Sequence, residues 1–144
     1  MERILFVCTG NTCRSPMAEA LLKAKKLNGI EVKSAGVHAF PGSDASEYAK
    51  EALKEIGIEH SHAASLLDQE LVDWATRILT MTSGHKQLII RNIPNAAHKT
   101  STLKEFVAES NSDVSDPFGS SLDVYRKTLN ELKELVDKLV ERLT

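Results

Sequence analysis

Residues 4–16 of the chain read Ile-Leu-Phe-Val-Cys-Thr-Gly-Asn-Thr-Cys-Arg-Ser-Pro. The first four residues form a continuous apolar run, which is typical of a β-strand buried on both faces. A turn-rich segment follows at residues 9–11. Pro16 suits the first position of a helix, and Ser15 is placed to cap it. The stretch therefore predicts a buried strand, a short loop and a helix N-terminus.

The rest of the chain continues this alternation of strands and helices. Helical periodicity covers residues 16–27, 44–56, 68–74, 84–90 and 122–143, and strand-like runs cover 30–35, 77–81 and 99–103. Ser120 and Asp123 resemble a capping box at the start of the last helix. The alternation predicts an α/β fold, a single domain over residues 1–144 with a parallel sheet and helices on both faces. Ligands of such folds bind at the carboxyl ends of the strands, and the first strand ends at Cys8.

Composition excludes several classes of protein. The chain has 144 residues and a formal net charge of −2, which gives no basic footprint for nucleic acid. Two cysteines in all argue against a secreted disulfide scaffold. The apolar run at the N-terminus is too short for a signal peptide or a membrane span. We expect a cytoplasmic protein without a membrane partner; the oligomeric state is open, with a monomer favoured.

The loop after the first strand has the composition of an anion-binding site. Successive backbone N–H groups that lead into a helix N-terminus can surround a phosphate, and Gly10 and Asn11 tolerate the left-handed backbone that such a loop needs. Arg14 can hold two phosphate oxygens. Cys8 would then lie under the phosphorus, where the helix dipole and the guanidinium favour a nucleophilic thiolate. The Ser15 hydroxyl is placed to donate to that thiolate.

A phosphatase also needs a proton donor for the leaving group. Asp116 is the best candidate, because Pro117 stiffens its loop and Phe118 could line the substrate entrance. Asp-Pro is also common in plain turns, so a turn without catalytic function is an equally good interpretation of these residues alone. Asp113 is a second, weaker candidate.

The chain resembles the low-molecular-weight protein tyrosine phosphatases over essentially its whole length. The resemblance rests on Cys-Thr-Gly-Asn-Thr-Cys-Arg-Ser at 8–15, Asp-Pro-Phe-Gly at 116–119, Ser-Ala-Gly at 34–36 and Met-Thr-x-x-His at 81–85. It implies a four-stranded parallel sheet and a protein phosphatase without metal or cofactor, acting on phosphorylated proteins.

The same resemblance implies roles for individual residues. Cys8 is expected to be the nucleophile, Arg14 the phosphate-binding residue, and Asp116 the general acid and later the base. Other positions are expected to bind substrate or to support the loop. The expected substrate-binding residues are Thr9, Gly10, Asn11, Thr12, Cys13, Ser15 and Phe118, and Asn11, Ser34 and His62 are expected to form a polar network that holds the loop.

Two departures from the family pattern bear on the substrate. Tyrosine phosphatases of this family usually carry a second aromatic residue where this chain has Gly119, and a bulky aliphatic residue where it has Thr12. Thr12 resembles the bacterial branch that removes phosphate from arginine. A hydroxyl there could orient a guanidinium leaving group or the attacking water. The sequence therefore favours phosphoarginine over phosphotyrosine as substrate, with an ordinary tyrosine phosphatase as the alternative.

Other classes fit less well. Arsenate reductases with this fold relay electrons through later cysteines, and no cysteine follows Cys13. Phosphotransfer subunits of sugar transport also place a cysteine at a strand end, but Arg14 is not expected there. A non-catalytic phospho-reader would need neither a nucleophile nor an acid.

The remaining reactive side chains suggest redox control but no metal site. Cys13 could form a disulfide with Cys8 and protect it from overoxidation, although Cys13 could also be a packed small residue. His60 and His62 are a close pair without a third ligand in the sequence, so no metal is expected there. Trp74 is expected to pack, and Lys23 to lie with Lys25 and Lys26 on a solvated face.

Overall fold

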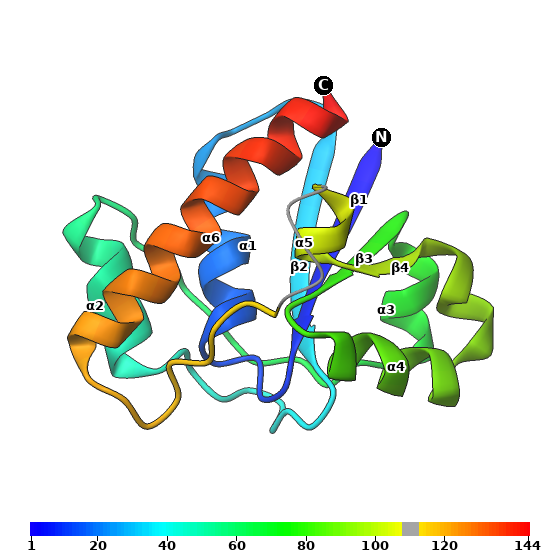
Figure 1. The fold of residues 1–144 in the computed structure, drawn as a ribbon, viewed down its shortest axis with the longest axis horizontal. Helices are drawn as coiled ribbons and strands as arrows, with labels where there is room; N and C mark the ends of the chain where they lie inside the picture. The colour runs from blue at the N-terminus through cyan, green and yellow to red at the C-terminus, as the bar shows by residue number, and fades with distance from the viewer. Residues whose placement is uncertain (108–112) are drawn as a thin grey trace.

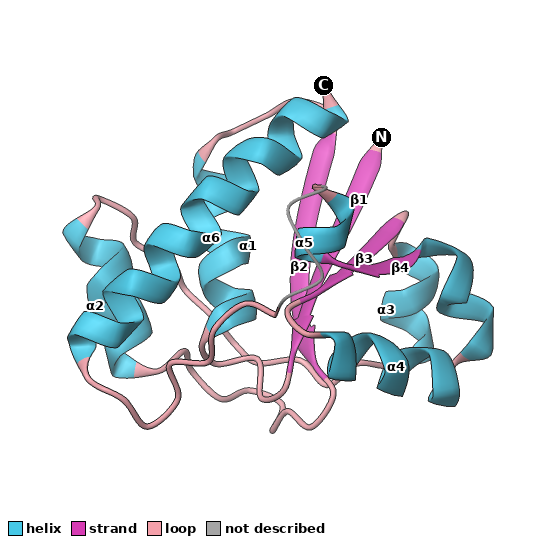
Figure 2. Ribbon diagram, in the orientation of Figure 1, coloured by secondary structure: helices cyan, strands magenta, loops and turns pink. Residues whose placement is uncertain are grey.

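The computed structural model describes residues 1–107 and 113–144. Four parallel strands form one sheet with the order β2-β1-β3-β4, and helices cover both of its faces (Figures 1 and 2). The strands are β1 Glu2–Cys8, β2 Ile30–Gly36, β3 Arg77–Thr80 and β4 Thr100–Thr102. The helices are α1 Arg14–Ala24, α2 Glu47–Glu55, α3 Gln69–Trp74, α4 Ser83–Asn92, the 3-10 helix η1 Pro94–Lys99, α5 Leu103–Phe106 and α6 Leu122–Leu143. The predicted α/β fold and its four-stranded parallel sheet are confirmed.

The loop after Cys8 lies at the point in the sheet where the order of the strands reverses. The chain leaves β1, forms α1 and returns as β2 on one side of β1, whereas β3 pairs with the other side. The register sets Cys8 opposite Gly36 and Val7 opposite Thr80. Ligand sites of open α/β sheets lie where the strand order reverses in this way. The loop after Cys8 therefore lies in the crevice that the topology creates.

Alternate residues of β1 serve two separate cores. Ile4 and Phe6 join the larger cluster, which includes buried residues of α1 and α6, whereas Leu5 and Val7 join a smaller cluster with residues of α3 and α4. All four side chains are fully buried. This explains the unbroken apolar run, because side chains of a strand alternate between the faces and both faces are covered.

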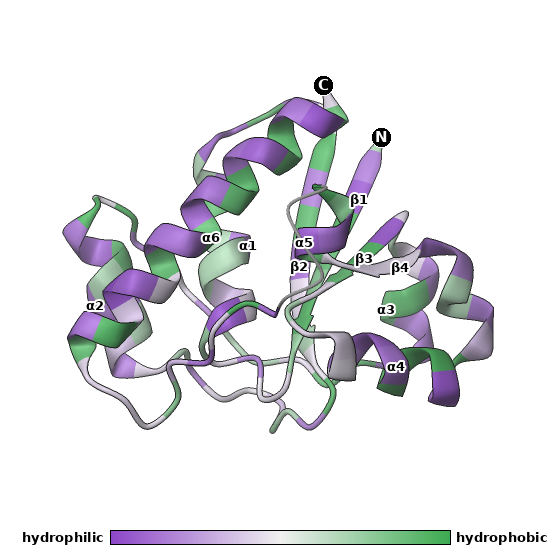
Figure 3. Ribbon diagram, in the orientation of Figure 1, coloured by the Kyte–Doolittle hydropathy of each residue, from purple (hydrophilic) through white to green (hydrophobic). Residues whose placement is uncertain are grey.

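The last helix forms the outer wall of the larger core. Its apolar residues recur three or four apart, and Figure 3 shows the resulting bands of hydrophobic and hydrophilic residues along α6. The buried members are Tyr125, Thr128, Leu129, Leu132, Leu135, Val136 and Leu139. The predicted start is wrong by one residue, because Ser121 rather than Ser120 caps the helix by accepting from the Val124 N–H.

Several predicted boundaries also differ from the structure. The helix expected over 16–27 begins at Arg14 and ends at Ala24, since Lys26 adopts a left-handed backbone with φ of 50°. The helix expected from residue 44 begins only at Glu47, after the Ser46 cap. Short helices such as η1 and α5 carry too little periodicity to be recognised. No helix within 1–107 and 113–144 is long and apolar enough to cross a membrane.

Candidate active site

The thiol of Cys8 lies at the end of β1, where a hydroxyl group meets it. Cys8 Sγ and Ser15 Oγ are 2.8 Å apart, and both residues are buried. Ser15 lies inside α1 rather than capping it; the residue before the helix is Cys13, which has no side-chain cap bond. The predicted capping role of Ser15 is therefore wrong, because its hydroxyl is engaged at the thiol instead.

Asn11 organises the loop from its centre. It is fully buried and adopts the left-handed backbone with φ of 56°, a conformation that asparagine tolerates. Its amide Nδ2 donates to Ser15 Oγ at 2.8 Å and to Ser34 Oγ at 2.9 Å. Its Oδ1 accepts from the Ser65 N–H at 2.9 Å. Gly10, also expected in this conformation, does not have a positive φ.

The network includes His62 and Ser34, which the family resemblance suggested, and continues to Glu19, which it did not. His62 Nε2 lies 2.6 Å from the Asn11 carbonyl oxygen, and Ser34 donates to a carboxylate oxygen of Glu19. Glu19 is only 7% exposed, and its second oxygen lies 3.5 Å from His60 Nε2. Sequence reasoning missed Glu19 as a loop-supporting residue. One signal was present: Glu19 is four residues after Ser15, and that spacing puts both on one face of the helix.

The guanidinium of Arg14 contacts two residues of the loop that carries Asp116. Its side chain is 6% exposed, Nη1 donates to the Val114 carbonyl oxygen at 3.1 Å, and Nη2 lies 3.6 Å from Asp116 Oδ2. The structure thus brings Cys8, Arg14 and Asp116 to one place, although Asp116 lies about a hundred residues further along the chain.

The loop that carries Asp116 is exposed and is held by a few local contacts. The Asp116 side chain is 56% exposed and accepts from the Phe118 N–H at 3.0 Å, while Phe118 itself is 76% exposed. Ser115 anchors the loop to α6 through Thr128 at 3.1 Å. Asp113 instead accepts from the Ser83 N–H at 2.9 Å and does not line the pocket, which weakens it as an alternative acid.

A buried histidine supports the first residue of the loop. His85 Nε2 lies 2.8 Å from Thr9 Oγ1, and the His85 backbone N–H donates to Thr82 Oγ1, which caps α4. Burial and the nearby Arg14 guanidinium lower the pKa of His85 to about 4. The imidazole is therefore neutral at physiological pH. The sequence marked His85 only as a family landmark, without a role.

These side chains enclose a pocket of about 210 Å³. It is lined by Cys8, Thr9, Gly10, Thr12, Cys13, Arg14, Asp116 and Phe118. Eight residues that the sequence singled out thus meet around one cavity, and Thr12 lines it together with Cys8. Because α1 begins at Arg14, its first backbone N–H groups lack acceptors within the helix and can bind an anion.

The Cys13 thiol contacts hydroxyl groups of two other segments. Both cysteines are free thiols, and Cys13 Sγ lies 3.4 Å from Tyr125 Oη and 3.7 Å from Ser46 Oγ. A Cys8–Cys13 disulfide therefore stays a prediction, and forming it would require Cys13 to leave these two hydroxyl groups.

The second strand approaches the loop so closely that it leaves no room for a side chain. A Cβ atom built on Gly36 would overlap the Thr9 carbonyl oxygen and would come within 2.8 Å of the Asn11 backbone nitrogen. The last residue of the Ser-Ala-Gly segment therefore has a steric reason to be glycine.

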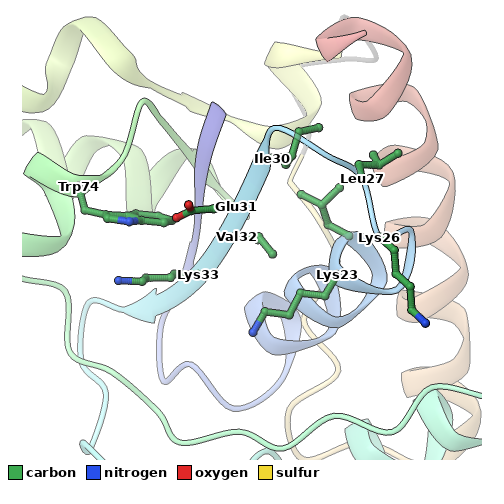
Figure 4. A pocket seen from close by; sticks show the side chains of 9 residues that line it. Lys23, Lys26, Leu27, Ile30, Glu31, Val32, Lys33 and Trp74 are labelled. Atoms are coloured by element: carbon green, nitrogen blue, oxygen red, sulfur yellow. The ribbon is translucent and has the colours of Figure 1, made fainter. Parts of the chain in front are cut away.

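A larger hollow lies at the outer edge strand β2, with none of the catalytic candidates in its wall. It measures about 310 Å³, and Figure 4 shows Trp74 and Lys33 on one side and Lys23 and Lys26 on the other. Lys33 Nζ lies 4.5 Å from the centroid of the Trp74 ring. Trp74 is half-buried and contacts the smaller core, which agrees with its predicted packing role.

A thiol at the end of a central strand, facing a helix N-terminus and a buried guanidinium, places this α/β protein among the cysteine-dependent phosphatases. Residues 3–144 match the family described as "Low molecular weight phosphotyrosine protein phosphatase". The chain belongs to this family.

Two relatives have a more specific description. A protein-arginine-phosphatase of Geobacillus stearothermophilus is 58% identical over 141 residues, which cover 98% of this chain and 95% of the relative. A protein-arginine-phosphatase of Bacillus subtilis (strain 168) is 49% identical over 144 residues, with 97% and 95% covered.

Solved structures agree with this relationship. The YwlE arginine phosphatase from Geobacillus stearothermophilus superposes with a TM-score of 0.98 at 57% identity, covering 99% of this chain and 93% of the other. A YwlE variant with a phosphorylated active-site serine in place of cysteine has a TM-score of 0.95 at 48% identity, with 98% and 95% covered.

Proposed function

We propose that the protein removes the phosphoryl group from phosphorylated arginine side chains of cytoplasmic proteins. The observation that carries this proposal is the position of Thr12, a residue that lines the same pocket as Cys8, Arg14 and Asp116. The high identity to protein-arginine phosphatases supports it. A hydroxyl group, rather than a hydrocarbon chain, faces the leaving group in this proposal.

In the first step, the Cys8 thiolate attacks phosphorus and forms an S–P bond while the P–N bond to arginine breaks. The electron pair of the P–N bond goes to the guanidine nitrogen, which takes up a proton. Asp116 is placed to donate this proton or to hold the departing guanidinium, and Arg14 binds the phosphoryl oxygens. Ser15 Oγ, 2.8 Å from Cys8 Sγ, stabilises the thiolate before attack and when the thiolate forms again.

In the second step, a water molecule attacks the phosphorus of phosphocysteine and the S–P bond breaks. Asp116, now a carboxylate, accepts the proton of that water. The products are inorganic phosphate and the Cys8 thiolate. The serine of the YwlE variant, phosphorylated in its structure, corresponds to such an intermediate on that protein, which supports Cys8 as the residue that carries the phosphoryl group here.

The preference for phosphoarginine in this proposal follows from the hydrogen-bond acceptors that a guanidinium needs in the pocket. The guanidinium of arginine is planar and carries several N–H donors, which need acceptors when the pocket closes around them. Thr12 can accept one such bond. A branched aliphatic residue would leave a donor unpaired at a cost of about 1–3 kcal/mol, which is a factor of about 5–150.

An ordinary tyrosine phosphatase is the second candidate. Phe118 is 76% exposed at the pocket and can pack against an aromatic ring. Gly119, which follows it, provides no second aromatic wall. The two candidates share the nucleophile, the anion site and the acid, so they differ only in the leaving group.

The test is a comparison of kcat/KM for phosphoarginine and phosphotyrosine in the wild type, Thr12→Ile and Thr12→Ser. We expect Thr12→Ile to lose phosphoarginine turnover by about 5–150-fold and to keep or gain phosphotyrosine turnover. Thr12→Ser retains the hydroxyl and should keep the wild-type preference. A folding defect would lower both activities together. An unchanged ratio in Thr12→Ile would remove Thr12 as the selector and favour the tyrosine phosphatase.

A further inference from the structure

Three potential metal ligands gather beside the phosphate loop. They are Glu19 of α1 and two residues of the segment after α2, His60 and His62, and one ligand atom of each lies within 4.8 Å of the other two. The histidine pair was visible in the sequence without a third ligand. The fold supplies this ligand from a distant helix.

The environment of the His60 side chain is that of a group with a free coordination position. The side chain is only 8% exposed, and Nε2 is buried without a hydrogen-bond partner in the part of the chain that the structure describes. A buried polar atom without a partner costs about 1–3 kcal/mol, so such atoms usually have a reason to remain. Glu19 Oε2 lies 3.5 Å from this nitrogen, which is a long contact for a hydrogen bond.

We propose that Glu19, His60 and His62 form a binding site for Zn²⁺. Two imidazole nitrogens and one carboxylate oxygen are typical zinc ligands, and a water molecule can take the fourth position. Mg²⁺ and Ca²⁺ prefer oxygen ligands and are disfavoured by the two imidazoles. The metal has no part in the phosphatase chemistry, because Cys8, Arg14 and Asp116 lie outside this set.

The spacing of the ligands is close to what Zn²⁺ needs. Tetrahedral zinc with bonds of about 2.0–2.2 Å requires ligand atoms about 3.3–3.5 Å apart. The Glu19–His60 pair already has a separation of 3.5 Å. The ligand atom of His62 lies within 4.8 Å of the other two, so His62 must move closer to reach zinc spacing, and it lies on a segment without regular secondary structure. Its Nε2 contact with the Asn11 carbonyl, at 2.6 Å, makes Nε2 the protonated nitrogen and leaves the lone pair on Nδ1.

One cation competes for the site. Lys23 Nζ lies 2.7 Å from Glu19 Oε2, but the lysine side chain is 51% exposed and can turn into solvent. Exposed ion pairs contribute only about 0–1 kcal/mol, so the lysine is a weak competitor. Glu19 keeps its bond from Ser34, which uses the other carboxylate oxygen.

The test is a calorimetric titration of ZnCl₂ into the full-length protein carrying Cys8→Ser and Cys13→Ser, which removes the thiols as alternative ligands. We expect one Zn²⁺ per chain and a change in the ring resonances of His60 and His62 by NMR. Adding His60→Ala should weaken binding by at least about tenfold. His98→Ala, which removes an exposed histidine outside the cluster, is the matched control and should leave the affinity unchanged.

Lys23→Met tests the same site without removing a ligand or a buried group. It removes the competing cation, so we expect tighter Zn²⁺ binding, and its exposed position makes a folding defect unimportant. Equal affinity of the His60→Ala and His98→Ala proteins would overturn the proposal. So would zinc-induced NMR changes confined to other histidines.

Discussion

The two halves of the active site are built in opposite ways. On the nucleophile side, Cys8, Asn11 and Ser15 are at most 3% exposed and are joined by hydrogen bonds between side chains. On the Asp116 side, Asp116 and Phe118 are mostly exposed, and their loop is held by a local bond from the Phe118 N–H, by the bond of Ser115 to Thr128 of α6 and by its contact with Arg14. One half is fixed before the substrate arrives, and the other is presented to solvent.

This difference separates two physical requirements. The thiolate and the anion site need fixed donors in a buried setting, because preorganised dipoles stabilise charge without reorganisation. In the proposed mechanism, the Asp116 carboxyl must reach a leaving group that belongs to a large protein substrate, so it has to be accessible. Arg14 connects the halves, since its buried guanidinium binds the Val114 carbonyl and faces Asp116.

Removing the nucleophile should have the largest effect and should leave the fixed half in place. We expect Cys8→Ser to lower turnover by about 10⁴-fold or more, since a hydroxyl is a far weaker nucleophile than a thiolate. Binding of vanadate or inorganic phosphate, measured by calorimetry, should persist because the loop and Arg14 are unchanged. Substantial activity in the serine variant would contradict the covalent mechanism.

Removing the acid should cost less and should show that the exposed half contributes little to stability. Asp116→Asn is expected to lower kcat/KM by about 10²–10⁴-fold for a substrate with a poor leaving group. The melting temperature should change little, because surface substitutions usually alter stability by less than about 0.5 kcal/mol. Asp113→Asn is the matched control, with a carboxylate three residues away that binds Ser83 instead. Equal losses in both variants would argue against a specific role for Asp116.

The smallest expected effect is on the pH dependence of stability, through His85, which supports the first residue of the phosphate loop. His85 is neutral in the folded protein, with a pKa of about 4, whereas in the unfolded chain it takes up a proton below about pH 6.5. The stability that this lowered pKa contributes is therefore fully present above pH 6.5 and is lost as the pH falls toward 4. We expect the wild type to lose about 1–3 kcal/mol more stability over this range than His85→Gln. Urea unfolding at several pH values measures this difference, and parallel curves for the two proteins would contradict it.

Other titrating groups affect the stability of the wild type and of the His85→Gln protein equally. Arg14 and His38 disfavour the charged form of His85, whereas Asp113 and Asp116 favour it. All four remain in the His85→Gln protein. His60, whose pKa is also lowered, contributes with the same sign to both proteins. The difference between the two curves therefore isolates His85.

The sequence predicted the parts of the site that depend on local context. Cys8 and Arg14 lie on one short loop between a strand and a helix, so their convergence follows from neighbouring residues. Asp116 required the family resemblance, because Asp-Pro alone is also a common turn. Its place beside Arg14 depends on how the end of the chain packs, which periodicity does not encode.

Other features were beyond local reasoning because tertiary contacts decide them. Ser15 has the composition of a helix cap, yet the nearby thiol takes its hydroxyl. Glu19 has the spacing of an ordinary residue in the first half of the helix, yet it is buried against Ser34 and close to His60. In both cases the partner comes from a segment distant in sequence or from the opposite end of the loop, and single-sequence patterns do not report such partners.

The close approach of Gly36 to the loop has a consequence for protein engineering. Transplanting residues 8–15 into another parallel sheet would transfer the reactive groups but not the space they need. The recipient scaffold must end its adjacent strand in a residue without a side chain, because any Cβ there would collide with the backbone at Thr9 and Asn11. A search for scaffolds able to accept this catalytic segment can therefore begin with one position on a neighbouring strand.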